Sequence, residues 1–238
     1  MKQSTEKRKL RSSSTKLPIL RVGEIVLVIQ VRYARHAHAS VIRQLFALGL
    51  KKIDQGVLVM LESEEQLSKL VAISDYIVFG YPPPALVDRL VRLRGKVRRK
   101  VNEEGEIVVG SNAPRAKRRG KKKKRKRGEE EDEMEGMEEV SLSDNVIVEQ
   151  IFGDKNLVCI EDIVHHLTSP SSGGGGDEEE EENNNAVRKF ISSTLLPFQL
   201  QSPLSRFERK ILKTKLPKRQ RVGFVEEENL IALVEMMI

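Results

Sequence analysis

The chain of 238 residues carries 42 Lys and Arg residues against 35 Asp and Glu residues, a formal charge of +7, and only 39% hydrophobic residues. The absence of Trp and an aromatic content of 4% predict a modest, largely aliphatic core. A single cysteine excludes an intramolecular disulfide framework, and no apolar run approaches the roughly 20 residues that span a bilayer. With no signal-peptide pattern at the start, we expect a soluble intracellular protein.

The charge is concentrated in three tracts. Residues 115–127 hold 11 of the 42 basic residues, and residues 129–139 and 177–182 together hold 14 of the 35 acidic residues. The rest of the chain therefore keeps 31 basic and 21 acidic residues. A basic surface of this kind favours a polyanionic partner.

The first half of the chain alternates strands and helices. Runs rich in β-branched residues predict strands at 24–33, 57–61 and 76–79, the last one stopped by a turn from Gly80 to Pro84. Helical spacing predicts a first helix capped by Ser40 and ended at Gly49.

Two more helices follow the same logic. One is predicted to begin after Ser63, and another to cover 85–94 with Pro84 in its first turn. Residues 96–101 and 106–109 are expected to form a hairpin. This order predicts an α+β fold with a βαβαβ core and added helices.

Beyond residue 110 the pattern is interrupted by charge. No secondary structure is expected in 111–139, and 169–185 is interpreted as a linker. Between and after them we expect helices from Ser143 or Asp144 to residue 151, and at 161–167, 186–192 and 226–238, with a short extended segment at 157–159. The predicted organisation is a flexible basic arm (1–20), a core (21–110), a charged insert (111–139), a helical continuation (140–168), a linker (169–185) and a C-terminal extension (186–238).

Four segments carry a family resemblance. They are LFALGLKKIDQGVLVML at 45–61, DYIVFGYP at 75–82, LSDNVIVEQIFGDKNLVCIEDIVHHL at 142–167 and PFQL at 197–200. Together they resemble the large-subunit ribosomal protein seven family of eukaryotes, which shares its core with bacterial ribosomal protein thirty. The resemblance implies a ferredoxin-like core bound to large-subunit ribosomal RNA, without catalytic chemistry, cofactor or small-molecule substrate.

The RVGF motif at 221–224 and the lysine cluster are closer to the nucleolar assembly-factor branch of that family. This branch implies binding to precursor ribosomal RNA near the internal transcribed spacer, with ribosomal proteins and assembly factors as neighbours. A divergent constituent of the mature large subunit, located on cytoplasmic ribosomes, remains the alternative.

Candidate RNA contacts are the basic residues around the predicted core, because Lys and Arg neutralise phosphates and release counterions. With few aromatic residues available, recognition is expected to rest on shape and phosphates. The set comprises Arg32, Arg35, Arg43, Lys51, Lys52, Arg92, Arg94, Lys96, Arg98 and Arg99.

A second basic group has three interpretations: a nuclear import signal, an electrostatic RNA tether or a solvated linker. We favour the first two acting together. The group comprises Lys117, Arg118, Arg119, Lys121, Lys122, Lys123, Lys124, Arg125, Lys126 and Arg127.

Catalytic and metal-binding alternatives rest on few residues. His36 and His38 form a His-x-His pair with no convincing third ligand, so no metal is expected. Cys159, His165 and His166 invite a hydrolase or nuclease hypothesis, against a structural interpretation in which Cys159 is packed and acidic residues begin a helix. The family resemblance, together with the basic composition, therefore implies a non-enzymatic RNA-binding assembly factor of the large subunit, in the nucleolus or nucleus.

Overall fold

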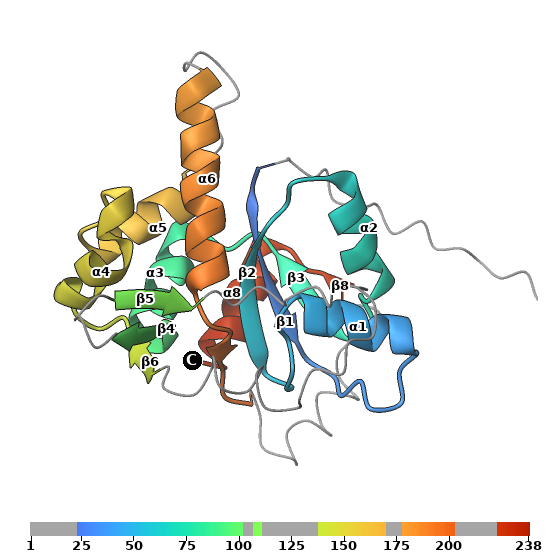
Figure 1. Cartoon of the computed structure of the whole chain (residues 1–238). Helices are drawn as coiled ribbons and strands as arrows, with labels where there is room; N and C mark the ends of the chain where they lie inside the picture. The colour runs from blue at the N-terminus through green and yellow to red at the C-terminus, as the bar shows by residue number, and fades with distance from the viewer. Residues whose placement is uncertain (1–22, 102–106, 111–137, 170–177, 203–222) are drawn as a thin grey trace, which may run out of the picture.

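The computed structural model describes residues 23–101, 107–110, 138–169, 178–202 and 223–238 (Figure 1). The main sheet has five strands in the order β7-β2-β1-β3-β8. Its strands are β1 (Ile25–Gln30), β2 (Gln55–Met60), β3 (Ile77–Gly80), β7 (Phe198–Gln199) and β8 (Gly223–Phe224). The second sheet has the order β5-β4-β6, with β4 (Lys96–Val101), β5 (Ile107–Gly110) and β6 (Glu138–Ser141).

Helices cover both faces of the main sheet (Figure 1). The described helices are α1 (Ala39–Ala47), α2 (Glu64–Ala72), α3 (Pro84–Arg94), α4 (Asn145–Phe152), α5 (Ile160–Thr168), α6 (Glu178–Thr194) and α8 (Glu227–Glu235), with a 3-10 turn at Gly153–Lys155. The fold is of the expected α+β class and is compatible with a ferredoxin-like core. In the described part of the chain, no helix is long and apolar enough to cross a membrane.

Strand β1 is the centre of the main sheet. It is antiparallel to both neighbours, so that Leu27 lies opposite Leu58 on β2 and Gly80 on β3. All six β1 residues are buried, because side chains alternate between two covered faces. Val26 and Val28 pack on the α1–α2 side, whereas Leu27 packs on the α3 side.

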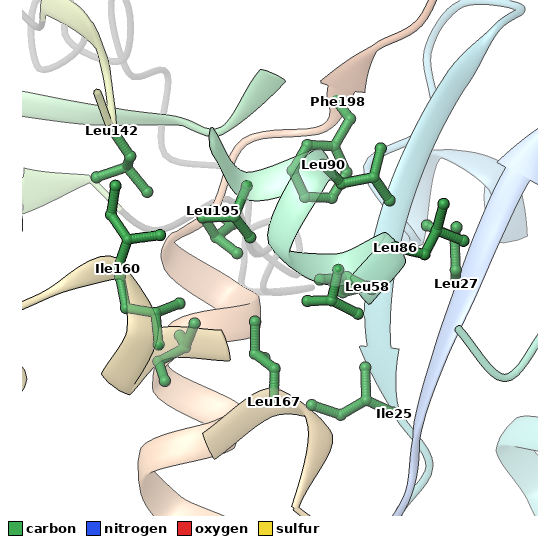
Figure 2. Close-up of a cluster of buried hydrophobic side chains, with 14 of the residues drawn as sticks. Ile25, Leu27, Leu58, Leu86, Leu90, Leu142, Ile160, Leu167, Leu195 and Phe198 are labelled. Carbon is green, nitrogen blue, oxygen red and sulfur yellow. The ribbon is translucent and has the colours of Figure 1, made fainter. Parts of the chain in front are cut away.

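The α3 side of the sheet holds the larger apolar cluster (Figure 2). Leu86 and Leu90 of α3 lie over Leu27 and Leu58 of the sheet. The cluster continues through Leu195 toward the elements of the second sheet and α5. Each fully buried aliphatic side chain of this kind stabilises the fold by about 1.5–3 kcal/mol. This cluster joins segments far apart in sequence into one core.

The strands and helices predicted in the first half of the chain are confirmed, with one correction at a helix start. Helix α1 is capped by His38, whose Nδ1 accepts a hydrogen bond from the Ser40 backbone N–H at 3.3 Å. Ser40 itself lies inside the helix, so the predicted Ser40 cap is wrong. At the other end, Gly49 follows the last turn with φ of +80°, a conformation that a residue without Cβ adopts at little cost.

The starts of α4, α5 and α8 lie at or next to the expected residues. Asp144 caps α4 by accepting a hydrogen bond from the Val146 N–H at 3.2 Å, and Gly153 is the C-cap. The expected helix at 161–167 is α5, and the terminal helix is α8. The segment 157–159 lies outside the named strands.

Two segments interpreted as unstructured are partly regular. Residues 178–185, assigned to a linker, form the first half of the 17-residue helix α6. Glutamate is a good helix former, which accounts for the regular structure of this acidic stretch. Glu138 and Glu139, assigned to the charged insert, belong to β6 and lie opposite Arg99 and Arg98 on β4. The rest of both segments lies outside the described residues.

Candidate nucleic-acid interface

A short turn before β2 presents two lysines. The backbone N–H groups of Lys51 and Lys52 donate to Oε1 of Gln55 at 2.9 and 2.8 Å. Gln55 is buried, with 5% of its surface exposed, and Asp54 adopts a left-handed conformation with φ of 62°. The buried amide fixes the turn, while both lysine side chains extend into solvent.

The end of β1 lies against the same turn, because β1 and β2 are antiparallel. The Asp54 N–H donates to the Gln30 carbonyl oxygen at 2.8 Å. The amide of Gln30 then donates through Nε2 to the carbonyl oxygen of Arg32 at 3.1 Å. Arg32 follows the end of β1, and Lys51 and Lys52 precede the start of β2. The three residues therefore lie at the same end of the sheet.

Helix α1 and the loop before it join these two places (Figure 1). Arg35 lies in the loop, and Arg43 lies on the exposed side of the helix. We call the five cations here the basic end of the sheet: Arg32, Arg35, Arg43, Lys51 and Lys52. All five are exposed, and none forms an ion pair with a carboxylate among the described residues. Their charge is therefore available to a ligand.

The cations of α3 are engaged within the protein. Arg92 donates through Nε to Asp88 at 2.7 Å and through a terminal nitrogen to Glu161 on α5. The hydrogen bond from Arg92 lowers the pKa of Glu161 below its ordinary value. Arg94 donates to the carbonyl oxygen of Ile238. These two arginines thus link α3 to α5 and to the C-terminal residue.

The cations of β4 are also largely engaged. Arg98 forms an ion pair with Glu139 of β6 at 2.9 Å, and Arg99 donates to Oε1 of Gln150 at 3.1 Å. The carbonyl of Lys96 accepts from the Leu196 N–H at 2.8 Å, while its side chain is exposed. Cross-strand pairs of opposite charge stabilise a sheet modestly.

The ten predicted contacts therefore fall into two groups. Five of them lie together at the basic end without a carboxylate partner among the described residues. In the α3–β4 group, the four arginines form contacts within the protein. Sequence reasoning missed Gln55, whose only signal was a polar residue opening a buried strand. The ten basic residues 117–127 of the import-signal group lie outside the described residues.

The Cys159 cluster has the geometry of a helix start. The Asp162 carboxylate accepts from the backbone N–H groups of Val158 and Cys159 at 3.1 and 3.0 Å, which closes the N-terminal turn of α5. A hydrogen bond to Asp162 raises the pKa of the Cys159 thiol. A nucleophilic cysteine needs the opposite shift, because the thiolate is the reactive form. This arrangement supports the structural interpretation of Cys159.

In the described part of the chain, no group of three or more His, Cys, Asp or Glu side chains converges on one place. His38 of the His-x-His pair caps α1, with its Nδ1 accepting a hydrogen bond from the Ser40 N–H. His165 and His166 lie with ring centroids 6.0 Å apart on α5.

A groove beside β2 also bears on the question of a catalytic site. It has a volume of about 440 Å³ and is lined by residues of α1, β2, α2 and α6. Its walls are mostly aliphatic, and its charged lining residues are Glu62, Lys69 and Lys189. Glu62 and Lys189 pair with each other at 2.6 Å. The groove holds no catalytic pair.

The fold and the basic end define an α+β protein with a fixed, positively charged surface. The chain is 24% identical over 187 residues to the large ribosomal subunit protein uL30 of Caenorhabditis elegans, which covers 79% of this chain and 56% of that protein. It is 23% identical over 205 residues to uL30 of Tetrahymena thermophila, covering 86% and 64%. No family model matches the chain.

A second kind of relative is a ribosome biogenesis protein. The chain is 28% identical over 151 residues to RLP7 of Eremothecium gossypii, covering 62% of this chain and 41% of that protein. Accordingly, the chain spans less than two thirds of the length of each of these three relatives. The chain is similar to the uL30 proteins and to RLP7, as its motifs predicted. Neither name describes an enzyme, in agreement with the non-enzymatic function expected for this chain.

Proposed function

We propose that this chain is a non-enzymatic, RNA-binding assembly factor of the large ribosomal subunit. It binds precursor ribosomal RNA near the internal transcribed spacer and supports its processing. The observation that carries the proposal is the basic end of the sheet, where five exposed cations keep their charge free of internal carboxylates. The similarity to RLP7 supplies the assembly role.

The chemistry of binding follows from this geometry. Gln55 holds the turn of Lys51 and Lys52 in one conformation, so that little ordering is needed when RNA docks. Each phosphate that a lysine or arginine neutralises releases condensed counterions, which drives association. The protein acts by holding an RNA segment and neighbouring assembly proteins in one arrangement, in the nucleolus or nucleus. Residues 117–127 add import and non-specific RNA attraction.

The second candidate is a structural constituent of the large subunit on cytoplasmic ribosomes. The uL30 matches favour it, because they extend over more of this chain than the RLP7 match does. The two functions share the fold and the basic end. They differ in the RNA that is bound and in whether the protein leaves before the subunit is mature.

Crosslinking in living cells, followed by sequencing of the attached RNA, tests the proposal. An assembly factor yields transcribed-spacer sequence among the crosslinked products. Mature ribosomal RNA alone, together with stoichiometric presence on salt-washed polysomes, would establish the ribosomal alternative. A variant with Arg32, Arg43, Lys51 and Lys52 changed to Gln controls for non-specific recovery and should lose most crosslinks.

A further inference from the structure

A hollow of about 380 Å³ lies beside the basic end. It is lined by Tyr33, Arg35, His36, Ala37 and Tyr76. The loop that carries four of these residues leaves β1 and leads into α1 (Figure 1). The volume of the hollow lies within the roughly 300–1,000 Å³ that is typical of small-ligand pockets.

The backbone around the hollow is fixed by the sheet. The carbonyl oxygen of Tyr76, the residue before β3, accepts from the N–H groups of Val31 and Arg32 at 3.0 and 3.2 Å. Beyond them, the Ala37 N–H closes a turn onto the carbonyl of Ala34 at 3.1 Å. The two tyrosines are therefore brought to one place by hydrogen bonds rather than by chance proximity.

Tyr33 contributes little to the core, since 64% of its surface is exposed. The guanidinium carbon of Arg35 lies 5.7 Å from the centroid of its ring. An exposed ring with a planar cation beside it is the arrangement on which unpaired bases stack in single-stranded RNA complexes. Tyr33 and Arg35 thus offer a base two flat, chemically suitable surfaces.

We propose that this hollow takes one unstacked nucleobase of single-stranded RNA, stacked on Tyr33 and Arg35. The neighbouring cations Arg32, Lys51 and Lys52 hold the flanking phosphates. The inference rests on the proposed RNA-binding function and adds to it one base contact, whereas the sequence predicted recognition by shape and phosphates alone. The lining includes no carboxylate, which favours an anionic ligand over a basic peptide.

Tyrosine fluorescence provides a direct test on the full chain. The chain has no Trp and three Tyr, and two of the three line the hollow. The third, Tyr81, lies elsewhere, with its ring 6.3 Å from that of Phe224. The probes are a 12-nucleotide single-stranded RNA, the same strand with abasic nucleotides, and a duplex of the same length. The base-bearing strand is expected to quench the fluorescence, and the abasic strand and duplex are not.

Substitution separates stacking from charge. Tyr33→Leu keeps an apolar side chain and is expected to weaken binding of the base-bearing strand by about 5- to 100-fold, as for the loss of one stacked base. Binding of the abasic strand and the duplex should change little. Tyr33→Phe keeps the ring and should bind all three probes as the unaltered chain does.

Three outcomes bear on the inference differently from the proposed function. If the unaltered chain binds none of the RNAs, the proposed function fails and the inference fails with it. If the unaltered chain binds RNA but Tyr33→Leu binds every probe as tightly as the unaltered chain does, the base site is refuted while RNA binding stands. An acidic peptide that quenches the fluorescence more strongly than RNA would assign the hollow to a protein partner instead.

Folding of the variant is checked by its thermal melt. If Tyr33→Leu does not fold, ultraviolet crosslinking of the unaltered chain to the base-bearing strand decides the question. A crosslinked peptide containing Tyr33 supports the base site. Crosslinks confined to other peptides overturn it.

Discussion

Arg188 on α6 donates through Nε to the carbonyl oxygen of His166 on α5, at 2.8 Å. Its terminal nitrogens donate to the carbonyl of Ser169 and, at 3.5 Å, to that of Gly23. Only 4% of Arg188 is exposed, and burial lowers the pKa of its guanidinium. One buried cation thus joins the end of α5, the start of the sheet and α6.

Replacing Arg188 by Met is expected to lower the free energy of unfolding by about 2–4 kcal/mol, because buried carbonyl groups lose a charged donor. Denaturation in urea measures the change. Lys189→Ala is the matched control. Lys189 is the next residue along α6, its side chain is 65% exposed, and it forms a surface ion pair with Glu62. The control should change stability by less than about 1 kcal/mol. An equal loss in both variants would contradict the joining role of Arg188.

The two groups of cations make different predictions for RNA binding. Changing Lys51 and Lys52 to Gln should reduce the slope of log affinity against log salt by about 1.5–2, as two phosphate contacts are lost. Arg98→Gln removes a cation that already pairs with Glu139 and should leave the slope nearly unchanged. Titration of a labelled RNA at several salt concentrations measures both. A larger slope change for Arg98→Gln would place the RNA on the second sheet.

Gly80 is required by the close approach of the C-terminal segment. A Cβ at this position would lie 2.5 Å from the carbonyl oxygen of Val225, whose N–H donates to Phe79 at 2.9 Å. Gly80→Ala is therefore expected to destabilise the protein by about 1–3 kcal/mol and to speed hydrogen exchange in residues 223–238.

Gly153→Ala provides the comparison for this change. Its added Cβ would meet only Glu149 Cγ, at 3.9 Å, so exchange and stability should stay close to those of the unaltered chain. Unchanged exchange in residues 223–238 of Gly80→Ala would show that the β3–β8 contact tolerates a side chain.

His166 predicts a loss of stability on mild acidification. Burial lowers the pKa of its imidazole, and the charges of His165 and Arg188 lower it further, against the opposing effect of Asp162. The unfolded chain, with the ordinary pKa of about 6.5, then binds more protons than the folded one. The free energy of unfolding should fall as the pH drops from about 6.5 through the folded pKa. Stability that rises over this interval would contradict the prediction.

His166→Gln should flatten the change between pH 7.5 and 5, measured by urea denaturation at each pH. The carboxylates of α5, Glu161 and Asp162, have pKa values below their ordinary ones and so titrate at lower pH than the histidine. Hydrogen bonds from Cys159 lower the pKa of Asp162, so its contribution is lost only as the pH falls further, below its ordinary value of about 3.9. The two effects occupy separate pH intervals.

Much of the fold could be predicted because hydrophobic periodicity records burial. The alternation around Leu27 and the helical spacing around Leu90 are visible in sequence, and both side chains are fully buried. The His38 cap was missed because imidazole rarely takes this role. The start of α6 was missed because a glutamate run resembles a linker unless the packing of the following turns is known.

The candidate site was harder to predict, since sequence does not show distance. Arg98 lies in a predicted strand and Lys52 shortly before another, and both are basic. Yet Arg98 pairs with Glu139 across β4 and β6, whereas Lys52 has no carboxylate partner in the described part of the chain. In the same way, Arg188 could not be told from a surface arginine. Tyr33 and Tyr76 are 43 positions apart, and only the sheet brings them to one hollow.

The main sheet is flanked by two short strands, Phe198–Gln199 and Gly223–Phe224. Both are translated long after the three strands between them. During synthesis, β2 and β3 emerge with their outer edges unpaired, and unpaired strand edges are templates for aggregation. These edges are closed only once residues 198–224 have been made. Premature termination after residue 197 would release a protein with a sheet open on both sides.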